Sequence, residues 1–369
     1  MDWMQLADAA AAVIPSPALV LYPERIEKNL HHMVSMTGGP ERLRPHLKTH
    51  KLPQILRRQL ALGITKCKAA TIAEAEMAAQ AGVPDVLLSA QPVGPGIQRF
   101  LQLAAAFPAT RFSALCDDEG VLSEIGRAAV ASDTTVDLLL DLDVGQGRTG
   151  RDPRVGAAAL YHAMRDTAGV RCAGLHAYDG HLHQPDPVER EAACTKAFKP
   201  VRALRDSLLA AGLSVPTVVA GGSPTFPFHA QNPEVECSPG TTVLWDAGYA
   251  AKLQDLEFLP SAALLTRVIS KPGSNRLCLD LGHKAVASEM PHPRVIFPAL
   301  PDAHPVAHNE EHLVLETAHA ADWHVGSVLY GIPWHICPTV ALHSEVYAAT
   351  PAGPPERWPV AARSRRITI

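Results

Sequence analysis

Short apolar runs alternate with longer segments of helical periodicity from about residue 40 to residue 245. The runs are apolar throughout rather than at every second position, which is typical of parallel strands buried on both faces. Eight runs of this kind predict an α/β fold, a (β/α)8 TIM-like barrel, rather than an open doubly wound sheet. The alternative is a Rossmann-like sheet, but no GxGxxG motif follows the first run. The eight strand candidates are LRPHLK, ITKCKAAT, DVLLSA, RFSALCD, VDLLLDLDV, VRCAGLHAY, PTVVAGG and EVECSPG.

The pattern changes after about residue 260, where short strand-like runs are separated by Gly and Pro turns. This predicts a C-terminal, mainly-β domain. We place the barrel at residues 25–258 and the β-domain at residues 1–24 and 259–369. The early stretch SPALVLYP either joins the β-domain or leads into the barrel.

Composition supports a globular protein, because 47% of the 369 residues are hydrophobic and 19% are charged. A net charge of −4 gives no long-range attraction to nucleic acid or to anionic lipid. The N-terminus lacks a basic region and is interrupted by Pro15 and Pro17, so we expect neither a signal peptide nor a membrane span. Seven cysteines without a CxxC motif indicate reduced thiols and a cytoplasmic protein.

Candidate chemistry gathers where the predicted strands end, which is where barrel enzymes place their active residues. Lys48 ends the first strand candidate, in RPHLKTHK. The cations and histidines around it, Arg44, His46, His50 and Lys51, are expected to depress its pKa and favour the free amine. The alternative is a solvated lysine in a basic loop.

Two small, hydroxyl-rich turns, GGSPTF and SPGTT, end the last two strand candidates, where barrels commonly bind phosphate. A phosphate cradle and a lysine at the same end of a barrel indicate pyridoxal 5'-phosphate bound as a Schiff base. The candidate phosphate-binding residues are Gly221, Gly222, Ser223, Thr225, Gly240 and Thr241.

His335 and Cys337, in HICPT, form a candidate metal pair. In an extended segment, residues i and i+2 project to the same side, so both side chains reach one ion. Imidazole with thiolate suits zinc and related divalent metals. Because only two protein ligands are evident, positions stay open for water and substrate, as a catalytic site requires.

These motifs together resemble the alanine-racemase-like, fold-type III family of pyridoxal-phosphate enzymes, and more narrowly its D-threonine aldolase and D-serine dehydratase branch. The resemblance implies a barrel with a C-terminal β-domain, usually as a homodimer. The matching segments, in order, are PSPALVLYPERIEKN, RPHLKTHK, ATIAEAEMAAQAGVPDVLL, DVGQGRTG, AYDG, GGSPT, SPGT, LDLGHKA, EEH and HICPT.

The resemblance also implies residue roles. Lys48 matches the lysine that binds the cofactor, Arg148 matches an arginine near the ring oxygen of the cofactor, and Tyr178 matches a tyrosine beside it. The GGSPT and SPGT segments match the phosphate loops, although relatives often carry an aromatic residue where this chain has Thr242. His335 and Cys337 match the ligands of a divalent metal, which is Zn, Mn, Co or Mg.

The implied substrate is a small D-3-hydroxy amino acid. The turn AYDGHLHQ resembles aldolases, and His181 and His183 in it are candidates for the base that takes the hydroxyl proton. Cys337 resembles dehydratases instead. We favour a D-threonine aldolase-like retro-aldol cleavage to glycine and an aldehyde, with a dehydratase that eliminates to a 2-oxo acid and ammonia as the alternative.

Two other classes fit less well. A racemase needs a second base, usually a tyrosine of the β-domain, and neither Tyr330 nor Tyr347 lies in a recognised racemase context. Non-enzymatic pyridoxal-phosphate carriers are single barrels, so the β-domain argues against one.

Overall fold

The computed structural model describes residues 2–6, 8–350 and 353–369. The remaining four residues, which the predicted β-domain ranges include, lie outside this description. The chain forms two compact units. We call residues 31–48, 53–240 and 364–369 the barrel unit, and residues 1–30, 49–52 and 241–363 the β unit. The chain passes from the barrel unit to the β unit directly after Lys48 and again directly after Gly240.

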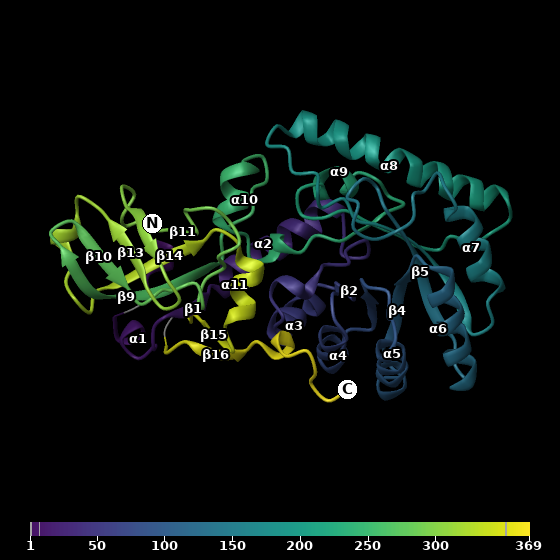
Figure 1. Ribbon diagram of the computed structural model, residues 1–369, viewed down its shortest axis with the longest axis horizontal. Coiled ribbons are helices and arrows are strands. Elements are labelled where there is room, and N and C mark those ends of the chain that lie inside the picture. Colours follow the sequence, from purple (N-terminus) through teal and green to yellow (C-terminus); the bar gives the residue numbers. More distant parts are fainter. Residues whose placement is uncertain (1, 7, 351–352) are drawn as a thin grey trace. The chain divides into compact units, whose positions relative to one another are not determined.

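The strands of the barrel unit lie side by side in chain order, and each is parallel to the next (Figure 1). They are almost entirely buried, which explains why their sequences are apolar on both faces. The strands are β2 (Lys66–Ala69), β3 (Asp85–Leu88), β4 (Arg111–Cys116), β5 (Val136–Leu142), β6 (Val170–Ala177), β7 (Val218–Ala220) and β8 (Glu236–Cys237).

Residues 42–46 close the barrel between its first and last strands. Arg44 donates its backbone N–H to the carbonyl of Cys237 at 2.9 Å, and Lys68 donates to the carbonyl of Pro45 at 2.9 Å. The first predicted strand therefore exists only as isolated bridges to β8 and β2. The predicted barrel is confirmed, and the open Rossmann-like sheet is excluded by this closure.

Helices follow the strands and cover the outside of the barrel, with α4 to α7 beside β2 to β5 (Figure 1). A partial capping box begins α4, because Thr71 accepts from the N–H of Glu74 while the Glu74 carboxylate accepts from the N–H of Ala70. None of the described helices combines the length and hydrophobicity needed to cross a membrane. The helices are α2 (Pro23–Thr37, shared with the β unit), α3 (Pro53–Ala61), α4 (Ile72–Gln80), α5 (Pro95–Ala106), α6 (Glu119–Ala131), α7 (Ala157–Asp166), α8 (Pro187–Ala210) and α9 (Phe226–Ala230).

A buried apolar cluster takes one residue from each of β3 to β7: Leu87, Leu115, Leu139, Ala173 and Val219. Two residues further along β5, and so on the same side of the strand, lies the carboxylate of Asp141. A polar layer thus follows the apolar layer toward the C-terminal ends of the strands. This is the end at which barrel enzymes place their active residues.

The β unit is built on a mostly antiparallel sheet in the order β12-β13-β10-β9-β1-β15-β16, with β14 pairing β9 and β11. The early stretch SPALVLYP joins this sheet, because β1 pairs with β9 and β15. All seven cysteines are free, as predicted. The elements are α1 (Asp8–Ala12), β1 (Ala18–Leu21), α10 (Ala247–Lys252), β9 (Ala262–Gly273), β10 (Arg276–Leu279), β11 (Val295–Ile296), β12 (His304–His308), β13 (Leu313–Glu316), β14 (Val328–Pro333), α11 (Ile336–Leu342), β15 (Glu345–Ala348) and β16 (Glu356–Pro359).

Candidate cofactor and metal sites

Three cations surround the ring of Tyr178, which directly follows β6. Nζ of Lys48 lies 5.7 Å from the ring centroid, Cζ of Arg148 lies 5.1 Å from it, and Nζ of Lys68 lies 5.2 Å from it. Lys48 sits in a 3-10 turn (Leu47–Thr49) directly after the segment that closes the barrel. The structure therefore brings together the three barrel residues that the sequence assigns to the cofactor ring and adds a second lysine.

Three of the other basic residues of RPHLKTHK are either paired with carboxylates or neutral. Arg44 binds two carboxylates, those of Asp85 at 2.6 Å and Glu236 at 2.7 Å, so its charge is offset. Burial lowers the pKa of His46 well below its usual value and that of His50 to about 3, so both rings are neutral near pH 7. These three side chains therefore add little net positive charge around Lys48.

Lys68 was not singled out by the sequence. It is 2% exposed, and its Nζ lies 3.5 Å from Nε2 of His176, whose Nδ1 lies 2.7 Å from Asp141. Burial, and next the charge of Lys48, lower the pKa of Lys68 to about 7. The sequence signal available for it was a lysine between Cys67 and Ala69 in the strand KCKA.

The turn from Gly221 to Thr225 connects β7 to α9, and both of its hydroxyl side chains, Ser223 and Thr225, are buried. A side chain at Gly221, where φ is +82°, would place its Cβ 2.6 Å from Cδ2 of His229. Oγ of Ser223 accepts from the N–H of Gly240 at 3.2 Å. The structure thus joins the two predicted phosphate turns within the barrel unit. Thr241, which follows Gly240, is buried in the β unit.

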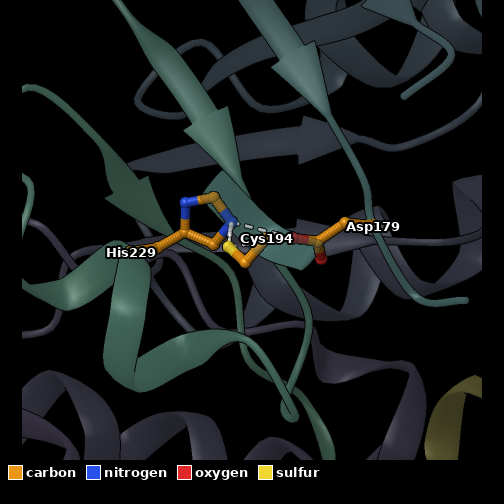
Figure 2. Close-up of side chains that lie close together, drawn as sticks. All are labelled: Asp179, Cys194 and His229. Carbon is orange, nitrogen blue, oxygen red and sulfur yellow. Dashed lines mark hydrogen bonds and ion pairs between the residues drawn. The ribbon is translucent and has the colours of Figure 1, made fainter. Parts of the chain in front are cut away.

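Beside this turn lies a buried trio that the sequence did not indicate, Asp179, Cys194 and His229 (Figure 2). Oδ2 of Asp179 lies 2.8 Å from Nε2 of His229 and 3.9 Å from Sγ of Cys194. Sγ also lies 3.4 Å from Nε2. These three ligand types at this spacing could hold a metal ion.

The structure distinguishes the two candidate bases. His181 is partly buried, and its Nδ1 is a buried atom without a hydrogen-bond partner among the described residues. A side chain at Gly145 would lie 3.2 Å from Nε2 of His181, so this ring packs against the DVGQGRTG loop that carries Arg148. His183 is exposed. A buried, unpartnered ring nitrogen is available for a substrate.

The segment that carries the predicted metal pair is not extended. β14 ends at Pro333, His335 is the N-cap of α11, and Cys337 lies in the first turn of that helix. The prediction of an extended i, i+2 pair is wrong. The two side chains still approach each other, because the imidazole of His335 forms a hydrogen bond with the sulfur of Cys337.

Within the β unit, Nδ1 of His335 lies 2.5 Å from Oε1 of Glu289. Burial alone would lower the pKa of His335, but its contacts with Cys337 and Glu289 raise it to about 9. Burial alone would raise the pKa of Cys337, but the hydrogen bond and charge of His335 leave it below the usual value. The two side chains therefore favour each other's charged forms.

Two threonines also contact the sulfur of Cys337. Sγ of Cys337 lies 3.5 Å from Oγ1 of Thr241 and 3.3 Å from Oγ1 of Thr49. Thr49 is the covalent neighbour of Lys48, and Thr241 is that of Gly240. Each of these two threonines of the β unit is therefore the next residue in the chain after a cofactor-site candidate of the barrel unit.

Comparison with known proteins agrees with this geometry. Residues 22–245 match the family model of the alanine racemase, N-terminal domain, and residues 261–349 match that of a serine dehydratase domain. A D-threonine aldolase of Arthrobacter sp is 33% identical over 361 residues, which cover 95% of this chain and 93% of that protein. A 3-hydroxy-D-aspartate aldolase of Paracoccus denitrificans (strain Pd 1222) is 26% identical, with 95% and 93% covered.

Solved structures agree as well. The D-threonine aldolase from Filomicrobium marinum has a TM-score of 0.88 at 29% identity, with 95% of this chain and 96% of that chain covered. The D-threo-3-hydroxyaspartate dehydratase from Delftia sp. HT23 has a TM-score of 0.80 at 22% identity, with 95% and 98% covered, which shows the shared fold. The family predicted from the sequence is confirmed: the chain belongs to the D-threonine aldolase and D-serine dehydratase branch of the alanine racemase-like, fold-type III pyridoxal-phosphate enzymes, whose members here are lyases.

Proposed function

We propose that the chain is a pyridoxal-phosphate- and divalent-metal-dependent lyase that cleaves D-3-hydroxy amino acids by a retro-aldol reaction to glycine and an aldehyde. The observation that carries this proposal is the arrangement of Lys48, Arg148 and the unpartnered Nδ1 of His181 around the end of the barrel. The 33% identity with a D-threonine aldolase supports the same reaction. A second copy of the chain is part of the proposal, as the family resemblance implies.

The residues of the barrel unit fit the cofactor. A phosphorylated aromatic aldehyde needs an amine, a ring contact and an anion-binding turn, and Lys48, Tyr178 and the Gly221–Thr225 turn supply these. The turn excludes side chains, since a Cβ at Gly222 would lie 3.1 Å from Cε2 of Tyr178. The cations around the Tyr178 ring suit a ligand that carries negative charge.

When bound, the cofactor supplies an electron sink for the pair released at the substrate Cα. The amine of Lys48 would bind the aldehyde of the cofactor, and Arg148 would orient its ring oxygen. His181 would take the proton of the substrate β-hydroxyl at Nδ1, so that the Cα–Cβ bond breaks. His335 and Cys337 would hold a divalent ion, which would supply a Lewis acid for a hydroxyl oxygen.

One alternative has support of its own. Cys337, the match of residues 261–349 to a serine dehydratase domain, and 26% identity over 223 residues with a D-threo-3-hydroxyaspartate dehydratase favour elimination. In that reaction Lys48 would take the Cα proton, and a divalent ion held by His335 and Cys337 would supply a Lewis acid for the departing hydroxide. This scheme assigns no step to the partly buried His181, whereas the retro-aldol reaction uses it as the base, and for this reason we favour the aldolase.

Product analysis separates the two reactions. We expect the purified chain, incubated with the cofactor, Mn²⁺ or Zn²⁺ and D-threonine, to form glycine and acetaldehyde, and to leave L-threonine unchanged. Formation of 2-oxobutanoate and ammonia would instead establish the dehydratase. The Lys48→Ala variant should lose both turnover and the yellow chromophore. If the variant keeps the chromophore, Lys48 is not the cofactor lysine and the proposal fails.

A further inference from the structure

Asp179 connects the ring-binding end of the barrel to the phosphate turn. It follows Tyr178 directly, and its side chain is buried beside α9 (Figure 2). Oδ1 of Asp179 accepts from the N–H of Gly222 at 3.1 Å and from Oγ1 of Thr225 at 2.7 Å. One carboxylate oxygen therefore binds the turn at both its second and its last residue.

The other carboxylate oxygen binds the helix that follows the turn. Oδ2 of Asp179 accepts from Nε2 of His229 at 2.8 Å, and His229 is buried in α9 with its ring packed edge-on against Phe198. The same His229 ring blocks a side chain at Gly221. The turn is thus fixed by hydrogen bonds on one side and by direct contact on the other.

These bonds explain the trio without a metal ion. A buried carboxylate is stable when donors satisfy its oxygens, and Asp179 has three close donors and the weaker thiol of Cys194. A metal ion would have to displace the proton that His229 shares with Oδ2. The bonds to Gly222 and Thr225 point instead to a role in the shape of the turn.

We propose that Asp179, held by His229, is a positioning residue that presets the Gly221–Thr225 turn to bind the phosphate group of the cofactor. This inference rests on the proposed function, because it assigns the turn to that phosphate. Fixing the turn before the ligand arrives removes the ordering cost from binding. The N–H of Gly222 serves this bond, so phosphate contacts fall to the residues after it.

Comparing two ligands that differ only by the phosphate tests the assignment. The full-length chain, freed of cofactor, is titrated with pyridoxal phosphate and with pyridoxal, both read by the absorbance of the Lys48-bound chromophore. We expect Asp179→Ala to weaken pyridoxal phosphate about tenfold to a hundredfold, because charge-assisted hydrogen bonds are lost. The affinity for pyridoxal, which lacks the phosphate, should decrease less than about threefold, since the lysine and ring contacts are kept.

Matched variants separate positioning from general damage. In Asp179→Asn the amide oxygen can accept from Gly222 and Thr225 while the amide N–H₂ donates to the other tautomer of His229, so the ratio of the two affinities should stay within about threefold of wild type. Cys194→Ser, in the same trio, should leave the ratio unchanged. If Asp179→Ala is insoluble, His229→Leu should lower the ratio in the same direction.

Three results would overturn the inference. One is an equal loss of affinity for both ligands in Asp179→Ala, which means general damage. Another is zinc that remains bound in the His335→Ala/Cys337→Ser chain and is lost on adding Cys194→Ser, which makes the trio a metal site. The third is a wild-type chain that binds neither ligand through Lys48, which overturns the proposed function as well.

Discussion

A charged lysine inside a barrel is costly, because water no longer solvates the ammonium group. Lys68 is 2% exposed, and only Nε2 of His176 lies within hydrogen-bonding distance of its Nζ among the contacts described above. Its pKa is lowered to about 7, chiefly by burial, whereas the pKa of a lysine in an unfolded chain is about 10.4. Folding therefore releases a proton from Lys68 between these two values.

This shift predicts how stability depends on pH. Where the unfolded state holds more protons than the folded state, the free energy of unfolding rises with pH. The free-energy cost of burying Lys68 is therefore largest below about pH 7, and it decreases as the pH rises toward about 10. We expect Lys68→Met to raise the melting temperature of the cofactor-free chain most below about pH 7 and least near about pH 10.

Thermal unfolding of both chains across this pH range measures the difference. Lys196→Met, an exposed lysine on α8, is the control and should change the melting temperature little at any pH. A Lys68→Met difference that is constant with pH, or that grows toward high pH, would show that Lys68 is charged in the fold.

At the residue scale, sequence alone predicted the side chains that a family motif marks and missed those that tertiary contacts create. Lys48, Arg148 and Tyr178 lie together as the resemblance implied. Asp179 and Lys68 were missed, because their partners come from other strands and helices and leave no pattern in the local sequence.

At the scale of elements, the phosphate turn depends on a glycine for two separate reasons. Gly221 has a φ of +82°, which favours glycine, and a Cβ there would lie 2.6 Å from His229. Gly212, after α8, has a φ of +76° but nothing within 4 Å of its Cβ position. Comparing substitutions at the two glycines therefore distinguishes the effect of backbone strain from the effect of the contact with His229.

We expect Gly212→Ala to cost about 1 kcal/mol of stability, through backbone strain alone. Gly221→Ala should cost about 2 kcal/mol or more and also weaken cofactor binding about tenfold, because the turn must move away from His229. Melting temperatures and cofactor titrations of both variants measure this. Equal stability losses with unchanged cofactor affinity in both would show that the contact with His229 is unimportant.

Elements with a strong local pattern were predicted well, and those set by a few residues were not. The apolar runs identified β2 to β8 because both strand faces are buried. The segment after His335 was taken as extended, but it begins α11. Pro338 in the first helical turn was the missed signal, since proline is tolerated there and needs no N–H partner.

At the scale of the whole molecule, the predicted functional groups are divided between two units. Lys48, Arg148 and Tyr178 belong to the barrel unit, whereas His335 and Cys337 belong to the β unit. The number of strand candidates and the change of pattern near residue 260 were enough to predict both architectures. The exchange of residues 49–52 between the units was not predictable, because it depends on which core each short segment packs against.

This division predicts that the cofactor and the metal ion can be removed independently. Under the proposed function, chelation with EDTA should lower turnover of D-threonine about a hundredfold or more, because the metal ion would polarise the substrate hydroxyl. The yellow chromophore should persist, since no metal ligand is among the residues assigned to the cofactor. Absorbance and acetaldehyde release, measured on the same sample before and after chelation, test both statements.

Restoring Mn²⁺ or Zn²⁺ should recover turnover, and His335→Ala should behave like the chelated enzyme in both measurements. A racemase of the same fold would be indifferent to chelation, so full activity in EDTA would exclude the metal-dependent lyase. Loss of the chromophore on chelation would contradict the assignment of the cofactor and the metal ion to separate units. The independent behaviour follows from the division of the chain, because Lys48, Arg148 and Tyr178 belong to the barrel unit and both candidate metal ligands belong to the β unit.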